Sequence, residues 1–427
     1  MTTPLTPASP ASGLNGSQDN LAQSTAESAH RTAHQNDRDV QALIASATTG
    51  LVPMFHAAKQ LFCTKFIRTE RGMVQEGLSP RYTLITLMGL LRLEQAGESS
   101  PIAVLPTFEA LLRDSFASAK TASSNTTGVE RAVSSTSGAL VNNTGDLGLL
   151  LWLCALVAPE RLDDFFAQHD LATALEQFPD ARERRTMELS WILSGLAHAA
   201  YARPELRERL VPLATRLSST LQGNRGPAGA FGHQAASSAS GGVTGPLRGR
   251  LGSFADQVYP IYAFAWAHRA FGASAAFAGA LEIANSCADN ICREQGELGQ
   301  WWWHYDAKSG KAVGKYLVYA VHQHAMAPLA LFALSDAGGR DSSRELYLGL
   351  EWIYGANELE VDMRDAGANV IWRCIRPGKA RRYVDEALAM LNVSPKPKTP
   401  KELHVLYECW PYELGWLIYA FVGRAIG

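Results

Sequence analysis

Apolar residues concentrate in six windows of the chain, each with a polar or aromatic opening followed by a dense apolar stretch that includes small residues. Runs of β-branched residues with strict alternation are scarce, so these windows predict helices and an all-α fold. Because a helix that is apolar on all faces must be surrounded by protein, we expect the six helices to lie inside the molecule. The windows are SPRYTLITLMGLLRL from Ser79, GDLGLLLWLCAL from Gly145, TMELSWILSGLAHA from Thr186, FADQVYPIYAFAWAH from Phe254, VYAVHQHAMAPLALFAL from Val318 and YECWPYELGWLIYAF from Tyr407.

The segments that flank these windows are charged and amphipathic, as outer helices are. Inner apolar helices ringed by outer amphipathic helices predict a single (α/α)6 toroid domain over residues 39–427. An irregular α-solenoid of helix pairs is the alternative, although its repeats are normally spaced more regularly than these windows. The amphipathic segments are Arg161 to Gln177, Pro204 to Gln222, Ala273 to Glu294, Ser342 to Tyr354 and Lys379 to Leu391.

Three segments carry few large apolar side chains. Residues 1–38 are rich in Ser, Thr, Ala, Gln and Asn, and they cannot bury enough surface to offset the entropy of ordering. We therefore expect a disordered N-terminal tail. Two internal segments of similar character predict long loops near residues 115–144 and 222–252, and loops of such length are usually functional or mobile.

The composition narrows the range of partners and locations. Among 427 residues, 39 basic and 41 acidic side chains leave a net charge of −2, which favours neither nucleic acid nor an anionic membrane surface. The longest apolar run, residues 147–157, is well short of the roughly 20 residues that a membrane span needs. No basic region followed by an apolar stretch opens the sequence, and the six cysteines lack CxxC spacing, so we expect reduced core cysteines in a cytoplasmic protein.

The stretch QGELGQWWWHYDAKSGK, residues 295–311, is the most distinctive in the chain. Successive side chains on a helix turn by about 100°, so Trp301, Trp302 and Trp303 cannot all face one core from a helix. We expect at least one of them to line a surface or cavity, where an indole face stacks on a sugar ring or stabilises a carbocation. Packing of a loop against the barrel is the alternative.

Two histidines, His322 and His324, lie near the opening of the fifth window. Positions two apart on a helix are separated by about 200°, so the pair is a poor metal chelate and we expect no metal. Either histidine can face a cavity at a helix N-terminus, where the macrodipole favours a neutral imidazole that acts as a base. The alternative is a hydrogen-bonded core histidine.

Carboxylates recur at the openings of the apolar windows. Capping of helix N-termini explains some of them, but parallel inner helices would bring these openings to one rim. Acid-base chemistry on sugars uses paired carboxylates, or a carboxylate with a histidine, and Asp306 can reach the same rim from the loop after the tryptophans. The recurring carboxylates are Asp146, Glu188, Asp256, Glu408 and Glu413.

Cations cluster in the stretch IWRCIRPGKARRY. Arginine makes bidentate contacts with phosphate or carboxylate, so the cluster can bind an anionic group, and a solvated turn between helices is the alternative. The sequence has no Walker motif, no GxGxxG after a strand and no HExxH, and we expect no cofactor. The cluster comprises Arg373, Arg376, Lys379, Arg381 and Arg382.

Two stretches resemble a known group of enzymes. FADQVYPIYAFAWAHRAFG, from Phe254, resembles an inner helix of the N-acylglucosamine 2-epimerase and six-hairpin glycosidase group. GELGQWWWHYDAKSG is similar to the Gly-Trp turn that these enzymes place beside the sugar. The resemblance covers a small part of the chain. It implies an (α/α) toroid with histidines or carboxylates at the barrel mouth, roles that Asp256 and His322 would take.

A second resemblance points to terpenoid cyclases, which are also α/α toroids. Gln295, Gly299 and Trp301 fit their QxxxGxW signature. The DxDD catalytic motif of the cyclases is missing, and Asp362 and Asp365 form only a fragment of an aspartate-rich diphosphate motif. Fold analogy alone does not confer function.

The sequence as a whole favours an enzyme that binds a sugar or oligosaccharide in the mouth of the toroid and acts by hydrolysis, epimerisation or elimination. Asp256, His322, His324 and Glu413 are the candidate acid-base residues. The alternatives are a terpenoid cyclase-like protein acting on an isoprenoid and a non-catalytic helical binding protein, and no oligomeric state follows from the sequence. The candidate binding residues are Trp301, Trp302, Trp303, His304, Asp306, Tyr259, Trp410, Arg373 and Arg376.

Overall fold

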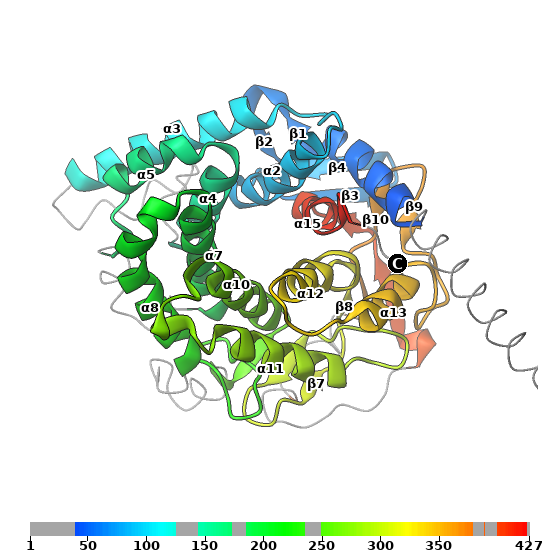
Figure 1. Ribbon diagram of the computed structural model, residues 1–427. Coiled ribbons are helices and arrows are strands. Elements are labelled where there is room, and N and C mark those ends of the chain that lie inside the picture. The colour runs from blue at the N-terminus through cyan, green and yellow to red at the C-terminus, as the bar shows by residue number, and fades with distance from the viewer. Residues whose placement is uncertain are drawn as a thin grey trace, which may run out of the picture.

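Twelve helices of the described chain form two concentric rings (Figure 1), which confirms the predicted (α/α)6 toroid. The computed structural model describes residues 39–124, 144–172, 185–234, 249–378, 388 and 399–424. The inner ring consists of α2 (Pro80–Gln95), α4 (Thr144–Val157), α7 (Thr186–Ala202), α10 (Ala255–Phe271), α12 (Ala327–Asp336) and α15 (Pro411–Phe421). The outer ring consists of a helix over residues 39–51, α3 (Val104–Ser124), α5 (Leu162–Gln168), α8 (Arg207–Gly223), α11 (Ala280–Arg293) and α13 (Ser343–Ile353).

The burial of the two rings follows their composition. All side chains from Leu149 to Cys154 on the inner helix α4 have 0% exposure. On the outer helix α11, Ala284, Cys287 and Ile291 are buried at helical spacing, whereas Glu282 and Asp289 are exposed. An all-apolar helix therefore lies inside the ring, and an amphipathic helix covers it with one face.

Contact between backbones closes the ring at its first and last inner helices. α15 packs against α2, and a Cβ atom at Gly89 would lie 2.2 Å from the carbonyl oxygen of Gly415. α4 approaches α7 in the same way, since a Cβ atom at Gly148 would lie 2.6 Å from the backbone nitrogen of Ile192. Glycine, which has no Cβ, permits these approaches. Figure 1 shows α15 beside α2, so the ring is closed and an open solenoid is excluded.

We expect Gly89→Ala to destabilise the protein by about 1–3 kcal/mol, because the added methyl group would meet rigid backbone of α15 rather than a flexible side chain. Gly223→Ala is the matched control, since Gly223 ends α8 and a Cβ atom there has nothing within 4 Å. Urea unfolding of both variants and the parent measures the effect. Equal free energies of unfolding for the two variants would show that this close approach does not hold the ring together.

Short strands precede two inner helices at positions where the apolar pattern predicted continuous helix. In the window from Val318, the first two residues form β8, and the π-helical turn η10 (His322–Met326) leads into α12. In the window from Tyr407, β13 precedes α15. These strands pair with distant segments of the chain, and such pairing is set by tertiary context rather than by local pattern.

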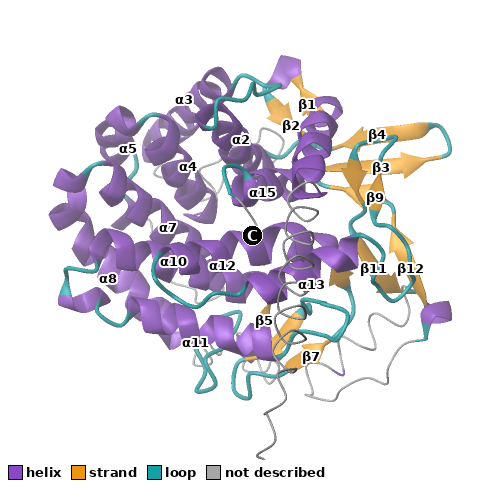
Figure 2. Ribbon diagram, turned by 45° about the vertical axis from the view of Figure 1, so that its right-hand side comes forward, coloured by secondary structure: helices purple, strands orange, loops and turns teal. Residues whose placement is uncertain are grey.

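The strands form small antiparallel sheets on one side of the helical body (Figure 2). The three-stranded sheets have the orders β5-β6-β7, β12-β11-β8 and β13-β3-β4, and the two-stranded ones are β1-β2 and β10-β9. Their bounds are β1 (Phe55–His56), β2 (Leu61–Phe62), β3 (Lys65–Thr69), β4 (Gly72–Glu76), β5 (Leu251–Ser253), β6 (His304–Asp306), β7 (Ala312–Gly314), β8 (Val318–Tyr319), β9 (Arg364–Asp365), β10 (Val370–Ile371), β11 (Cys374–Pro377), β12 (Leu403–Leu406) and β13 (Glu408–Cys409).

The segment 115–144, which the sequence predicts as a loop, begins as helix. α3 continues through it to Ser124. The Ser115 hydroxyl donates to the carbonyl of Leu112 at 2.8 Å, so a residue type that favours loops is satisfied inside a helix. Parts of the predicted segments lie outside the described residues. These parts are residues 1–38, 125–143, 173–177, 235–248 and, apart from residue 388, 379–391.

A layer of aromatic side chains fills the ring about one helical turn deeper than Tyr259. The Tyr262 hydroxyl lies 2.9 Å from the Tyr419 hydroxyl and 2.9 Å from Nε2 of His198. The Trp152 ring packs on both His198 and Tyr262, with centroid distances of 5.1 and 4.6 Å. Burial lowers the pKa of His198 well below its ordinary value, so this histidine stays neutral. These aromatic side chains therefore fill the interior of the ring at this level.

Candidate functional site

The first turns of four inner helices, together with the π-helical turn that leads into α12, meet at one cavity of about 500 Å³. Arg81 comes from α2, Met187 from α7, Asp256 from α10 and Tyr412 from α15, while His322 begins the turn before α12. The N-terminal ends of these helices therefore face the same cavity, as parallel inner helices in a toroid require. The lining residues are Arg81, Tyr82, Ile85, Met187, Trp191, His233, Leu251, Ser253, Ala255, Asp256, Tyr259, Trp303, His304, Tyr319, Val321, His322, Met326, Arg373 and Tyr412.

An ion pair connects the sixth inner helix, α4, to a residue that lines this cavity. Nε of Arg81 donates to Oδ1 of Asp146, on the first turn of α4, at 2.5 Å. Burial raises the pKa of Asp146, and the guanidinium of Arg81 opposes that shift. Asp146 therefore supports a cavity-lining arginine from behind.

Asp256 is an anchored carboxylate at the start of α10. Its Oδ2 atom accepts hydrogen bonds from the backbone nitrogen and the hydroxyl of Ser253, both at 2.8 Å. Oδ1 accepts from the backbone nitrogen of Met187 at 3.3 Å, and Nδ1 of His233 lies 3.1 Å from Oδ2. Free N–H groups at helix starts favour a carboxylate in this position.

His322 borders the cavity as a neutral imidazole. Burial lowers its pKa to about 3. Nδ1 lies 3.2 Å from the carbonyl oxygen of Trp301, which can only accept, so Nδ1 carries the hydrogen and Nε2 carries the lone pair. A ring held in this form can accept a hydrogen bond from a ligand hydroxyl.

Of the three consecutive tryptophans, Trp303 borders the cavity. Its ring is stacked on His322, with centroids 5.7 Å apart and planes 8° from parallel. Trp301 is fully buried, and its ring packs against Phe254 at 5.8 Å. Nε1 of Trp302 donates to the carbonyl of Glu294 at 2.8 Å. One indole is therefore available to a ligand, and the other two fix the loop.

Arg373 lines the cavity, and Glu413 lies behind it. The two side chains form a hydrogen-bonded ion pair, with 10% and 1% of their side-chain surfaces exposed. The guanidinium also lies over the ring of Trp410 at 3.3 Å, and Oε2 of Glu413 accepts from the Trp410 backbone nitrogen at 3.2 Å. Burial raises the pKa of Glu413, and the charge of Arg373 opposes that shift. Neither Glu413 nor Trp410 borders the cavity.

Two further predicted residues, Tyr259 and His304, line the cavity. The Tyr259 hydroxyl accepts a hydrogen bond from Nε1 of Trp416 at 3.0 Å, and burial raises its pKa. His304 begins β6, where it pairs with Ser253 of β5. Burial lowers the pKa of His304 to about 4, so this ring is also neutral.

Asp306 and Arg376 lie outside the lining. Burial opposes ionisation of Asp306, but hydrogen bonds from Arg250 and from the hydroxyl and backbone nitrogen of Ser309 lower its pKa overall. The carboxylate thereby fixes the turn after β6. Nε of Arg376 donates to Nε2 of His404 at 3.2 Å, across the pairing of β11 with β12.

His324 is fully buried and does not border the cavity. Among the described residues, neither of its ring nitrogens has a hydrogen-bond partner, and burial lowers its pKa to about 3. His322 and His324 therefore have different surroundings, as expected of positions two residues apart in a helical turn.

Several lining residues were not singled out by the sequence. Arg81, Tyr82 and Tyr412 lie in the polar or aromatic openings of apolar windows. Their position at these openings is the feature of the sequence that could have identified them. Tyr319 reaches the cavity from β8, a strand that the apolar pattern did not predict. His233 comes from the loop near residues 222–252, and nothing in its local sequence distinguishes it.

The motif shared with terpenoid cyclases has a structural role here. Nε2 of Gln295 donates to the carbonyls of Gly299 and Glu345, at 3.0 and 2.8 Å, which ties the turn to α13. Gly299 has a φ of +86°, and a Cβ atom there would lie 2.0 Å from the carbonyl oxygen of Leu348. The motif therefore joins two outer helices. Of the aspartate-rich fragment, Asp362 pairs with Arg364 and Asp365 pairs with Arg68, outside the cavity.

The described residues contain no group of three or more His, Cys, Asp or Glu side chains arranged to hold a metal ion. All six cysteines are free thiols, and five of them are buried. Within the same residues, every helix is too short or too polar to cross a bilayer.

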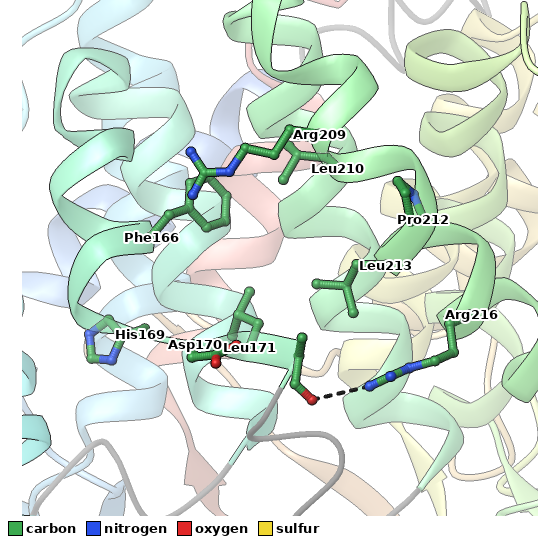
Figure 3. Close-up of a pocket in the computed structure, with 10 residues that line it drawn as sticks. Phe166, His169, Asp170, Leu171, Arg209, Leu210, Pro212, Leu213 and Arg216 are labelled. Atoms are coloured by element: carbon green, nitrogen blue, oxygen red, sulfur yellow. Dashed lines mark hydrogen bonds between the residues drawn. The ribbon is translucent and has the colours of Figure 1, made fainter. Parts of the chain in front are cut away.

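A second cavity, of about 680 Å³, lies between the outer helices α5 and α8 (Figure 3). Phe166 and Leu213 give it apolar walls. Arg209 lies over the Phe166 ring at 5.3 Å, and Arg216 donates to the carbonyl of Ala172 at 3.1 Å. No inner-helix opening contributes to this cavity. The candidate site is therefore the cavity of about 500 Å³ at the N-terminal ends of the inner helices, hereafter the mouth cavity.

The toroid is shared with solved structures of low sequence identity. One described as glycosyl hydrolase family 88 from Bacteroides vulgatus is 10% identical, with a TM-score of 0.52, and the match covers 90% of this chain and 97% of that one. A possible GH105 family member from Klebsiella pneumoniae is 12% identical, with a TM-score of 0.51 and coverage of 90% and 92%. Another from Salmonella enterica is 13% identical, with a TM-score of 0.50 and coverage of 90% and 93%. No family model and no curated protein sequence matches the chain.

Proposed function

We propose that the protein is an enzyme that binds a sugar or oligosaccharide in the mouth cavity and transfers protons on it. The observation that carries the proposal is one cavity wall, where the ring face of Trp303 lies beside His322 and Asp256 occupies the adjoining helix opening. Sugars present apolar ring faces and hydroxyl groups, which aromatic faces and a few placed polar groups recognise. The fold shared with structures described as glycosyl hydrolases supports this class by analogy.

The polarity of the lining favours a sugar over an isoprenoid. Guanidinium, imidazole, carboxylate and hydroxyl groups border the cavity together with the aromatic rings. A cyclase cavity shields a carbocation with aromatic faces, and basic or nucleophilic groups in contact with the cation would capture it or remove a proton. The polar groups, tyrosines aside, belong to Arg81, Arg373, His233, His304, His322, Asp256 and Ser253.

The number of carboxylates bears on the reaction. Among the described lining residues, Asp256 is the one carboxylate. Glycoside hydrolysis by the common two-carboxylate route needs a pair of acids that flank the bond, whereas epimerisation or elimination needs a proton-transferring group with hydrogen-bonding neighbours. Asp146 and Glu413, at neighbouring helix openings, are both paired with arginines. The arrangement supports proton transfer rather than two-carboxylate hydrolysis.

A thermal-shift screen of neutral sugars, uronic acids, nucleotide sugars and prenyl diphosphates tests the class of ligand. A ligand present at 100 times its Kd stabilises the folded state by about 2.7 kcal/mol. We expect a sugar to raise the unfolding midpoint. We expect Trp303→Ala to weaken its binding about tenfold, because an aromatic stacking contact contributes on the order of 1 kcal/mol.

Trp302→Ala is the matched control for this screen. Its ring packs against Tyr316 outside the cavity, so the variant should keep the parent's affinity even if it is less stable. The shift of each variant is measured against its own unliganded midpoint. A response to prenyl diphosphates alone would favour the isoprenoid hypothesis. Unchanged affinity in Trp303→Ala would remove Trp303 from the binding surface.

A further inference from the structure

His233 and Asp256 form a hydrogen-bonded pair at the cavity wall. Nδ1 of His233 lies 3.1 Å from Oδ2 of Asp256. An ionised carboxylate only accepts, so Nδ1 carries a hydrogen, and in the neutral ring the lone pair is on Nε2. The side chain of His233 is 32% exposed, whereas that of Asp256 is 1% exposed. The imidazole is therefore the member of the pair that a ligand in the cavity can reach.

The carboxylate of Asp256 is already engaged by other donors. Oδ2 accepts from the backbone nitrogen and the hydroxyl of Ser253, and Oδ1 accepts from the backbone nitrogen of Met187. With His233 this makes four donors directed at a buried group. Such a carboxylate orients a neighbouring imidazole and stabilises its charged form, as the aspartate of a catalytic triad does.

The loop that carries His233 is tied to two inner helices. The His233 carbonyl accepts from the backbone nitrogen of Thr186, at the start of α7, at 3.0 Å. Gln257 of α10 bonds both the backbone nitrogen and the carbonyl of Phe231, each at 2.8 Å. A Cβ atom at Gly232 would lie 2.4 Å from the carbonyl oxygen of Gly249, so glycine lets the two segments pass closely. These contacts preorganise the imidazole, which proton transfer requires.

The other two imidazoles of the described lining are less suited to take up a proton. Burial lowers the pKa of His322 to about 3 and that of His304 to about 4. A buried ring resists the positive charge that protonation brings. His233 instead has a direct hydrogen bond to a carboxylate and a larger exposed surface, so its imidazolium form has a partner.

We propose that His233 is the proton-transferring catalytic residue of the mouth cavity and that Asp256 is its positioning residue. The inference rests on the proposed function. In the step, the Nε2 lone pair forms an N–H bond as an O–H or acidic C–H bond of the sugar breaks, and that bond's electron pair stays on the sugar. The imidazolium, stabilised by Asp256, then returns the proton to the product, so no oxidant or further reactant is consumed.

Acylation by diethyl pyrocarbonate tests the accessibility of the His233 ring without any substrate. The reagent modifies unprotonated imidazole nitrogens, and peptide mass spectrometry of the intact protein's digest assigns each modified histidine. We expect His233 to react about tenfold faster than His322, since the His233 side chain is 32% exposed whereas His322 is 1% exposed. A His233 that reacts no faster than His322 would overturn the proposal, whatever the ligand screen finds.

The second arm uses the sugar that the protein is found to convert, with products followed by NMR. We expect His233→Ala to lower kcat about 100-fold or more with a smaller change in KM, because acid-base catalysis contributes about 10²–10⁴-fold. Asp256→Asn should also lower kcat. Added imidazole should restore part of the kcat of His233→Ala, which a merely structural role would not allow.

His56→Ala is the matched control, because His56 is exposed on β1 and lies outside the cavity lining, and this variant should keep the parent's kcat. A kcat for His233→Ala within a few-fold of the parent would overturn the role of His233 while the proposed function stands. Failure of every sugar to bind or to be converted would overturn both.

Discussion

Glu413→Ala should destabilise the protein by about 3–5 kcal/mol, because it would leave the guanidinium of Arg373 buried without its partner charge. The same substitution removes the side chain that accepts from the Trp410 backbone nitrogen at the start of α15. Both losses fall on the helix that closes the ring against α2. The free energy of unfolding in urea, at neutral pH, measures the effect.

Two further variants separate the charge from the rest of the side chain. Glu413→Gln keeps a hydrogen-bond acceptor for Trp410 but lacks the charge, so it should lie between the parent and Glu413→Ala. The double variant Arg373→Met with Glu413→Leu should recover much of the stability, since a buried ion pair can be replaced by apolar groups at little cost. Glu76→Ala, which breaks the exposed pair with Lys65, should change stability little. If Glu413→Ala behaves like Glu76→Ala, the buried pair does not stabilise the mouth.

The framework of the toroid was predictable because it depends on local composition. A stretch such as Leu149 to Cys154 has no polar face, so it can only lie inside the protein, and this holds whatever the rest of the chain does. The strands at the helix entrances were not predictable in the same way. Val318 and Tyr319 form β8 because Cys374 and Ile375, far along the chain, pair with them.

The residues of the mouth cavity also differ in whether local composition or tertiary contacts determine their position. Asp256 and His322 lie at the openings of apolar windows, and parallel packing of the inner helices was enough to bring them to one cavity. Trp301 and Trp302 share their sequence neighbourhood with Trp303, yet only the fold decides which indole faces the cavity. His233 reaches Asp256 from a loop that one hydrogen bond from the backbone nitrogen of Thr186 holds in place, and no spacing in the sequence encodes that contact.

The buried imidazole of His324 makes the stability of the fold depend on pH in one direction. The unfolded chain takes up a proton on this histidine near pH 6.5, whereas burial lowers the pKa in the folded protein to about 3. Between these values the unfolded state binds more protons, so the free energy of unfolding falls as the pH falls. The contribution of this group is fully present above pH 6.5 and is lost progressively on acidification towards pH 3, by about 1.4 kcal/mol for each pH unit.

The free energy of unfolding of His324→Leu minus that of the parent should therefore be larger in acid than at pH 8. Relative to its value at pH 8, we expect this difference to rise by about 2 kcal/mol at pH 5 and by about 3 kcal/mol at pH 4. Leucine fills a similar volume in the core, and the ring nitrogens that it replaces have no hydrogen-bond partner among the described residues. Urea unfolding of both proteins at pH 8, 6, 5 and 4 gives the comparison. His56→Leu, at an exposed position, should track the parent across the series. A constant difference between His324→Leu and the parent from pH 8 to pH 4 would mean that His324 takes up its proton over the same pH range in the folded and the unfolded state, because only then does its removal leave the proton balance of folding unchanged.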